Sequence, residues 1–227
     1  MKLTIFGPTG LVGQQVLAQA IAAGHDTTAV ARDPAKLGAQ VHSAPNVRVV
    51  TADLSHADPA LLKDSVDGAD AVLSAIGPRK KAEHGIVSKS AMALAAAVES
   101  ASVPRLLVVS GVGVSTVPTP GRPHPPKREP GAGLIMRYFA TPVARRVLGA
   151  HFVDVALMED FMRGCELDWT VMRVPYVMDR PPTGRYRTAY GHTLRAALRI
   201  AAADAAEFML RLIDQPEASR KVVTVAY

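Results

Sequence analysis

Residues 2–13 read KLTIFGPTGLVG, an apolar run followed by three glycines at positions 7, 10 and 13. The run at 2–6 is typical of a buried strand, and the Ala/Val/Leu-rich stretch from 11 to about 23 predicts a helix. A glycine-rich turn between a strand and a helix directs its backbone N–H groups and the positive end of the helix dipole toward the same point above the turn. A pyrophosphate can bind at this point. We therefore expect a dinucleotide site formed by Gly7, Thr9, Gly10, Leu11, Val12 and Gly13.

The three glycines have separate expected roles. Gly7 would form the sharp turn, Gly10 would let the backbone approach the phosphates, and Gly13 would let the helix lie close to the sheet. A bare three-glycine pattern also fits an ordinary glycine-rich connection. The strand before it and the helix after it favour the dinucleotide site.

Strand-like and helical segments alternate along the rest of the chain. Apolar runs predict strands at 27–31, 47–51, 71–76, 105–110, 169–174 and 222–226. Helices are predicted between them at 59–67, 86–102, 151–164 and 204–214. Because the strands are apolar throughout, helices should cover both faces of the sheet. We predict one α/β domain over 1–227, a Rossmann-like doubly wound parallel sheet in a three-layer α/β/α arrangement.

One segment, at about 114–150, interrupts this alternation. Seven prolines and six Lys or Arg residues lie between Gly111 and Ala150, a stretch too long for a simple connection. We predict a lid, a docking loop or a partly disordered segment here, with a short amphipathic helix over 134–148.

Composition limits the partners and the compartment. Residues 1–113 contain 10 Lys or Arg and 9 Asp or Glu, whereas residues 114–227 contain 16 and 11, without the interleaved aromatics of a nucleic-acid site. No apolar stretch approaches the roughly 18–20 residues that span a bilayer. A single cysteine, Cys165, fits a reducing cytoplasm, and because the first strand is predicted to start at Lys2 we expect no secretory leader. We expect a cytoplasmic monomer or homodimer that binds a small-molecule substrate, without nucleic-acid or membrane partners.

Residues that follow the predicted strands are further candidates for the site. In an open parallel sheet, ligands bind at the carboxyl ends of the strands. This rule selects Arg32, Asp53, Leu54, Ala75, Ile76, Gly77, Pro78, Arg79, Ser110, Pro175 and Tyr176.

The end of the second strand predicts which dinucleotide binds. Arg32 is the first charged residue after that strand, and a guanidinium suits the 2′-phosphate of NADP(H). Asp33 leaves an NAD interpretation open, because its carboxylate could bind a ribose hydroxyl or instead cap a helix at 35–37. Asp53 could likewise lie near the adenine or serve as a turn carboxylate. We predict NADP(H).

Taken together, these motifs resemble the atypical short-chain dehydrogenase/reductase group, and within it the NmrA-like and biliverdin-IXβ/flavin reductase branch. The resemblance rests on GPTGLVG (7–13), ARDPAKL (31–37), VTADL (50–54), DAVLSAIGPR (70–79), RLLVVSGVG (105–113), LDWTVMRVPYV (167–177) and ADAAEFML (203–210). It implies a Rossmann fold, an NADP-type cofactor and reductase chemistry. It also implies that adenine lies by Asp53 and Leu54, and nicotinamide by Ser110, Pro175 and Tyr176.

The chain departs from this family at the catalytic residues. Standard members use a Tyr with a Lys four residues later, and these positions fall on His151 and Val155 here. Gly111 and Val112 follow Ser110, so a second hydroxyl is missing. A reductase of flavins, quinones or enones tolerates this loss, because such acceptors need little acid assistance. The alternatives are a non-catalytic NADP-binding regulator and a secondary-pathway ketoreductase or isomerase.

Three residues remain as catalytic candidates. His151 could give a proton near neutral pH, or could be a surface or helix-capping residue. Tyr176 could contact the nicotinamide or pack in the core, and Ser110 could orient a ligand or bond its own turn. Asp204 is expected to cap a helix at 205–213. Trp169 and four methionines (158, 162, 172 and 209) are expected in the core, and no His, Cys, Asp or Glu cluster has metal-ligand spacing.

Overall fold

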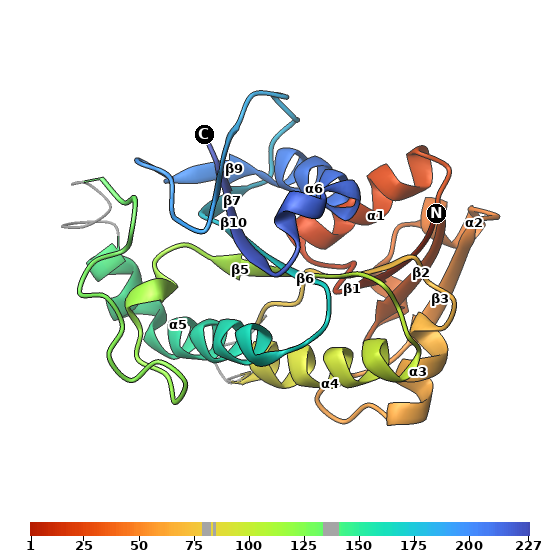
Figure 1. Ribbon diagram of the computed structural model, residues 1–227. Helices are drawn as coiled ribbons and strands as arrows, with labels where there is room; N and C mark the ends of the chain where they lie inside the picture. Colours follow the sequence, from red (N-terminus) through yellow and green to blue (C-terminus); the bar gives the residue numbers. More distant parts are fainter. Residues whose placement is uncertain (79–82, 84, 134–140) are drawn as a thin grey trace.

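The computed structural model describes residues 1–78, 83, 85–133 and 141–227, with the backbone alone at 141–148, and within these residues an eight-stranded sheet forms the middle layer (Figure 1). Its order is β3-β2-β1-β4-β5-β6-β10-β8, and every neighbouring pair is parallel except β10 with β8. The strands are β1 (Lys2–Phe6), β2 (Asp26–Ala31), β3 (Val47–Thr51), β4 (Ala71–Ser74), β5 (Leu106–Gly111), β6 (Trp169–Val174), β8 (Arg187–Tyr190) and β10 (Lys221–Ala226).

Helices cover both faces of this sheet (Figure 1). One face carries α1 (Leu11–Ala22) and α6 (Ala202–Arg211), and the other carries α3 (Pro59–Val66), α4 (Ile86–Ser100) and α5 (Thr141–Gly164). Neighbouring residues of β1 point into different cores, because Ile5 packs with Leu17 and Phe208 whereas Phe6 packs on the α3–α5 side. A strand buried on both faces is apolar at most positions rather than at every second one, which is why the strands lack alternation.

The remaining elements are short. They are α2 (Ala39–Ser43), β7 (Tyr176–Met178), β9 (Arg199–Ala201) and the 3₁₀ turns η1 (Pro34–Lys36), η2 (Val114–Thr116), η4 (Leu212–Asp214) and η5 (Pro216–Ala218). β7 and β9 pair in parallel as a separate two-stranded sheet. None of the helices in the described ranges has the length and apolar character needed to cross a bilayer.

The sequence-based expectations for the fold are confirmed in most elements. The predicted strands end within two residues of the observed ones. Asp58 caps α3 by accepting a hydrogen bond from the Ala60 N–H at 2.9 Å, with Pro59 as the first helical residue. Trp169 and the four methionines are buried in the core, as predicted.

The helix predicted at 151–164 starts earlier than expected. α5 begins at Thr141 and runs for 24 residues, so the separate helices expected at 134–148 and 151–164 are one helix from 141 onward. The chain remains helical through Gly149, which lies between the two expected helices. Residues 134–140 lie outside the described residues.

The described part of the proline-rich segment packs against α5 and β6. Glu129 is buried and accepts hydrogen bonds from Ser115 and Thr193 while it pairs with Arg173. Farther along the loop, the Gly121 N–H donates to Asp160 on α5 at 2.8 Å. A buried cluster around Glu129 and an exposed hydrogen bond at Gly121 therefore attach residues 114–133 to the α5 side of the sheet.

Candidate functional site

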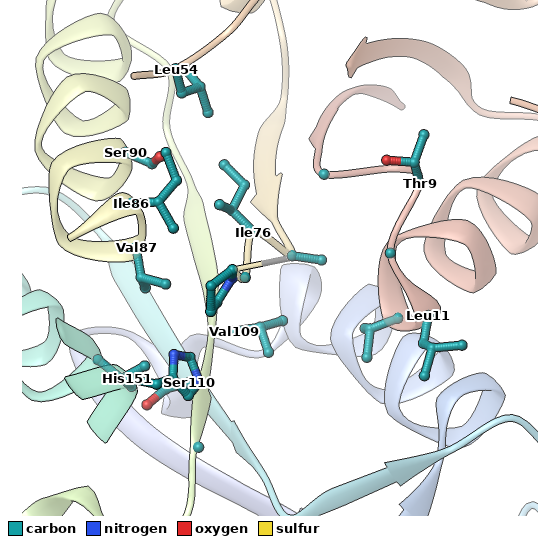
Figure 2. Close-up of a pocket in the computed structure, with 18 of the residues that line it drawn as sticks. Thr9, Leu11, Leu54, Ile76, Ile86, Val87, Ser90, Val109, Ser110 and His151 are labelled. Carbon is teal, nitrogen blue, oxygen red and sulfur yellow. The ribbon is translucent and has the colours of Figure 1, made fainter. Parts of the chain in front are cut away.

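A cavity of ≈ 420 Å³ opens at the carboxyl ends of β1, β2, β4, β5 and β6 (Figure 2). Its wall contains fifteen of the residues selected from the sequence: Gly7, Thr9, Gly10, Leu11, Val12, Arg32, Asp53, Leu54, Ala75, Ile76, Gly77, Pro78, Ser110, His151 and Pro175. Gly13 and Tyr176 are outside this wall, and Arg79 lies outside the described residues. None of the described residues from 114 to 133 belongs to the wall, and the lid stays a prediction.

The glycine turn holds its shape through close contacts within the chain. Gly7 has φ +75°, and a Cβ at this position would lie 2.8 Å from the carbonyl oxygen of Ala75. A Cβ on Gly13 would lie 2.1 Å from the carbonyl oxygen of Gly7. Both glycines are therefore required for α1 and β4 to approach the turn.

Gly10 differs from these two glycines. A Cβ there would meet protein atoms no closer than 3.6 Å, an ordinary contact. Gly10 is the N-cap of α1, no side chain caps this helix end, and its first turn contains no acidic residue. A free helix N-terminus behind a glycine turn fits the pyrophosphate of a dinucleotide.

At one end of the cavity, Arg32 and Asp53 each have a close polar contact. The Nη1 of Arg32 pairs with Oε1 of Glu83 at 2.9 Å. Asp53 accepts hydrogen bonds from the Ser55 hydroxyl at 2.6 Å and from the Ser55 N–H at 3.0 Å, and these bonds lower the pKa of its carboxyl. Asp53 is thus a turn carboxylate that also lines the cavity.

Asp33 does not take the role of a cap. Its carboxylate lies 2.9 Å from Lys36 Nζ and makes no capping bond to η1, so that interpretation was wrong. Asp33 is also absent from the cavity wall, whereas Arg32 is part of it. The lone cation at this edge of the described wall is therefore Arg32.

Ser110 lies at the other end of the cavity and is buried. Its hydroxyl donates to Glu159 Oε1 at 2.6 Å rather than to its own turn, so the local-turn interpretation was wrong. Arg173 pairs with both oxygens of Glu159, at 2.7 and 2.6 Å. Burial opposes the charge on Glu159, but Arg173 keeps its pKa below the ordinary value. An ionised Glu159 can only accept, so Ser110 presents its lone pairs to the cavity.

His151 also belongs to this end of the wall. It lies in the middle of α5 and is partly buried, and the expectation of a surface or capping histidine was wrong because α5 starts earlier than predicted. Burial lowers the pKa of His151, with Asp154 opposing the shift, so the imidazole is neutral at pH 7. Val155 follows one turn later in the same wall. The two positions that hold the catalytic Tyr and Lys in standard members of the family therefore line the cavity here, but they are occupied by His151 and Val155.

Tyr176 has an exposed side chain, 76 % accessible, which supports neither a ligand contact in the cavity nor core packing. Its neighbours Pro175 and Val177 both line the cavity. Successive residues of a strand point to opposite sides, and Tyr176 opens β7. The sequence identified the right strand end but the wrong side chain.

Asp204 does not cap a helix. α6 begins at Ala202, and the Asp204 carboxylate accepts hydrogen bonds from the N–H groups of Thr183 and Gly184 and from the Tyr227 hydroxyl. These long-range contacts fasten the loop after β7 to the end of the chain. The expected local role was wrong because the partners lie far away in sequence.

Besides these fifteen, the wall contains Gly111, which the same strand-end rule selects after Ser110, and ten residues that were missed as contacts: Val30, Ala31, Ala52, Ile86, Val87, Ser90, Val109, Val155, Val174 and Val177. Ile86, Val87 and Ser90 lie at the start of α4 (Figure 2). A helix that begins at the ligand-binding edge of the sheet places its first turns in the cavity wall. The predicted helix start at residue 86 could therefore have identified these residues. Within the described residues, no three His, Cys, Asp or Glu side chains are grouped as metal ligands.

Comparison with solved structures connects this geometry to known proteins. A protein from Burkholderia pseudomallei, named as a candidate exported protein, is 29 % identical over 100 % of both chains, with a TM-score of 0.75. A short-chain dehydrogenase/reductase from Veillonella parvula in complex with NADP is 14 % identical over 100 % of this chain and 94 % of that one, with a TM-score of 0.80. ChuY, an anaerobillin reductase from Escherichia coli O157:H7, is 18 % identical over 100 % and 97 %, with a TM-score of 0.74. The last two likenesses show the fold alone.

Sequence comparison gives the family. YwnB of Bacillus subtilis, an uncharacterised protein, is 32 % identical over 113 residues, which are 50 % of this chain and 48 % of YwnB. The match thus spans about half the length of that relative. The family model described as NAD(P)H-binding matches residues 7–216, nearly the whole chain and the complete glycine turn. The resemblance noted from the motifs is confirmed, and this chain belongs to the NAD(P)H-binding family.

Proposed function

We propose that this protein is an NADPH-dependent reductase that transfers a hydride to a small conjugated acceptor such as a flavin, quinone or enone. The observation that carries the proposal is the composition of the cavity: a cation at one end, a glycine cradle along the side, and a mostly apolar far end containing Ser110 and His151. When bound, the reduced nicotinamide supplies the hydride. The chain's own residues position the reactants and exclude water.

The choice of NADPH over NADH rests on Arg32. A guanidinium binds a phosphate through charge-assisted, bidentate hydrogen bonds. Arg32 is held at the cavity by Glu83, with half of its fork still available, since only Nη1 makes the contact with Glu83. A 2′-phosphate would share or replace that contact. Asp33, the carboxylate that would favour NADH, is turned to Lys36.

The acceptor would bind at the end formed by Ser110 and His151. Val155, Val174 and Val177 give this end apolar walls that suit a flat conjugated ring. Because Ser110 donates to Glu159, His151 is the side chain in the described wall of this end that can donate to an acceptor atom. The lowered pKa of His151 keeps the imidazole neutral, and a neutral imidazole carries one N–H.

Turnover tests the proposal. NADPH oxidation would be followed by absorbance with FMN, menadione and a simple enone. We expect turnover with at least one acceptor. In His151→Phe we expect a loss of about tenfold, below the roughly hundredfold or larger loss typical of a general acid, because these acceptors need little acid assistance. Tyr176→Phe is the matched control, because this exposed aromatic residue lies outside the cavity wall and should leave the rate unchanged.

Val155 favours one alternative, a non-catalytic NADP-binding regulator. It occupies the position of the Lys that standard members use, and a valine moves no proton. NADPH binding without oxidation by any of the three acceptors would support the regulator and refute the reductase.

The cofactor preference has its own test. NADPH and NADH affinities would be compared in the native protein and in Arg32→Ala. We expect the substitution to weaken NADPH binding by about tenfold or more and NADH binding little, in line with the contribution of a charge-assisted hydrogen bond. Equal affinities in the native protein, unchanged by the substitution, would refute the NADPH assignment.

A further inference from the structure

Two carboxylates lie close to the Arg32 guanidinium in the described part of the cavity edge. Nη1 of Arg32 pairs with Oε1 of Glu83 at 2.9 Å. Asp53 lines the cavity together with Arg32. Hydrogen bonds from Ser55 lower the pKa of the Asp53 carboxyl, and the charge of Arg32 adds to this shift. The Arg32 charge is therefore already compensated before any ligand arrives.

A 2′-phosphate would bring about two negative charges to this edge of the cavity at pH 7. The edge of the guanidinium formed by Nε and Nη2 makes no contact with Glu83, so a phosphate can approach while the ion pair is intact. It would then share one guanidinium with a carboxylate of the same sign. The phosphate must either displace Glu83 or bind against its repulsion, and both cost affinity.

Glu83 and Asp53 differ in how firmly they are held. Asp53 accepts hydrogen bonds from the hydroxyl and the N–H of Ser55, two residues away, which fix its carboxylate in the turn. The Arg32–Glu83 pair is open to water, with 36 % and 22 % of the two side chains accessible. An ion pair in contact with water is weak and can exchange partners. Glu83 is thus the carboxylate that a phosphate can replace.

We propose that Glu83 is a specificity-determining residue that opposes Arg32, because it weakens the binding of ligands with a 2′-phosphate. A ligand with a free 2′-hydroxyl is neutral at that position, so the Arg32–Glu83 pair stays intact in its complex. Glu83 therefore narrows the difference in affinity between NADPH and NADH that Arg32 creates. This inference rests on the cofactor assignment in the proposed function, and it is independent of whether a hydride is transferred.

The test uses two ligands that differ only in the 2′-phosphate, 2′,5′-ADP and 5′-AMP. Calorimetry would measure the Kd of each for the native protein and for Glu83→Gln, which keeps the size of the side chain and removes its charge. We expect the Kd of 2′,5′-ADP to fall about threefold, within the range of an exposed ion pair. The Kd of 5′-AMP should stay unchanged.

A matched control removes the same charge elsewhere. Glu166 pairs with Arg220 at 3.2 Å, and neither residue belongs to the cavity wall. Glu166→Gln should alter neither Kd, which separates a local effect of Glu83 from the net charge of the protein. If Glu83 only held Arg32 in place, its loss would weaken the binding of 2′,5′-ADP, the opposite of the expected result.

Three results would overturn the inference: an unchanged or raised Kd for 2′,5′-ADP in Glu83→Gln, equal tightening of both ligands, or the same gain in Glu166→Gln. A preference for 2′,5′-ADP that appears only in Glu83→Gln would support the inference and refute the NADPH preference of the native protein. If neither protein prefers 2′,5′-ADP, both are refuted. Native protein that prefers 2′,5′-ADP but oxidises no NADPH would refute the reductase alone.

Discussion

Gly10 and Gly13 lie one turn apart, and replacing each with alanine should have opposite consequences for stability and for binding. In Gly13→Ala the new Cβ would lie 2.1 Å from the Gly7 carbonyl oxygen and 3.1 Å from Pro8 Cα, both backbone atoms of the turn. In Gly10→Ala the nearest atoms would be at 3.6 and 3.8 Å. The first substitution disrupts the packing of the turn, whereas the second adds a methyl group to the pyrophosphate cradle.

The magnitude follows from these contacts. Overpacking costs roughly 1–3 kcal/mol, and a 2.1 Å contact with backbone places Gly13→Ala at the upper end of that range. Alanine regains roughly 1 kcal/mol over glycine inside a helix. The expected net loss of about 2 kcal/mol lowers the Tm by about 4–8 °C in a domain of this size. Gly10 has φ −87° and ψ 165°, so alanine fits there, and Gly10→Ala should change the stability by less than about 1 kcal/mol.

Circular dichroism melts of the free proteins and fluorescence titrations with NADPH measure the two effects. We expect Gly10→Ala to keep its Tm within about 3 °C while its Kd for NADPH rises about tenfold or more. Gly13→Ala should show the large fall in Tm. An unchanged Tm in Gly13→Ala would refute the close contact between α1 and the turn. A native Kd in Gly10→Ala would refute the placement of the pyrophosphate.

Three further substitutions test the buried polar groups. Glu159→Gln leaves Arg173 without its main counter-charge and should lower the free energy of unfolding by about 3 kcal/mol in denaturant melts, whereas no change would show that the buried pair is dispensable. The native protein should lose stability as the pH falls from about 6.5 through the lowered pKa of His151, because the unfolded chain binds a proton that folded His151 does not. The free energy of unfolding of His151→Gln should fall less over the same pH series. Equal slopes of this free energy against pH in the two proteins would contradict the lowered pKa. Asp204→Ala removes the acceptor for Thr183 and Gly184 and should cost about 2 kcal/mol and speed proteolysis at 180–185, so native resistance to protease would contradict this anchoring role.

The backbone of the site could be predicted from the sequence because its signals are local. An apolar run, a glycine spacing and a following helix are all contained in residues 2–23, and strand ends such as Ala31-Arg32 and Gly77 are visible as the points where apolar runs stop. The parallel sheet then brings these ends to one edge. Fifteen predicted residues therefore line the cavity, although most were selected one strand at a time.

Side-chain roles failed where the partner is distant in sequence. Ser110 and Glu159 are 49 residues apart, and Asp204 and Thr183 are 21 apart, so neither pair leaves a periodic signal. β7 and β9 are three residues each and depend on pairing with one another. Strands this short leave no recognisable sequence pattern, so the outward direction of the Tyr176 side chain could not be predicted. His151 was misjudged for a different reason, since an error in the start of α5 moved it from the interior of a helix to its end.

The same long-range contacts explain why the two ends of the cavity differ. At the acceptor end, Arg173 fixes Glu159, and Glu159 accepts the hydrogen bond that the Ser110 O–H donates, so this hydroxyl can meet only a ligand atom that donates. In the described wall at that end, His151 is then the side chain able to stabilise charge that develops on an acceptor oxygen or nitrogen. At the other end, the charged groups of the described wall are Arg32, which pairs with Glu83, and Asp53, which accepts from Ser55. This contrast between the two ends favours a ligand that spans the cavity, as the proposed dinucleotide with its acceptor would, over a small acceptor alone.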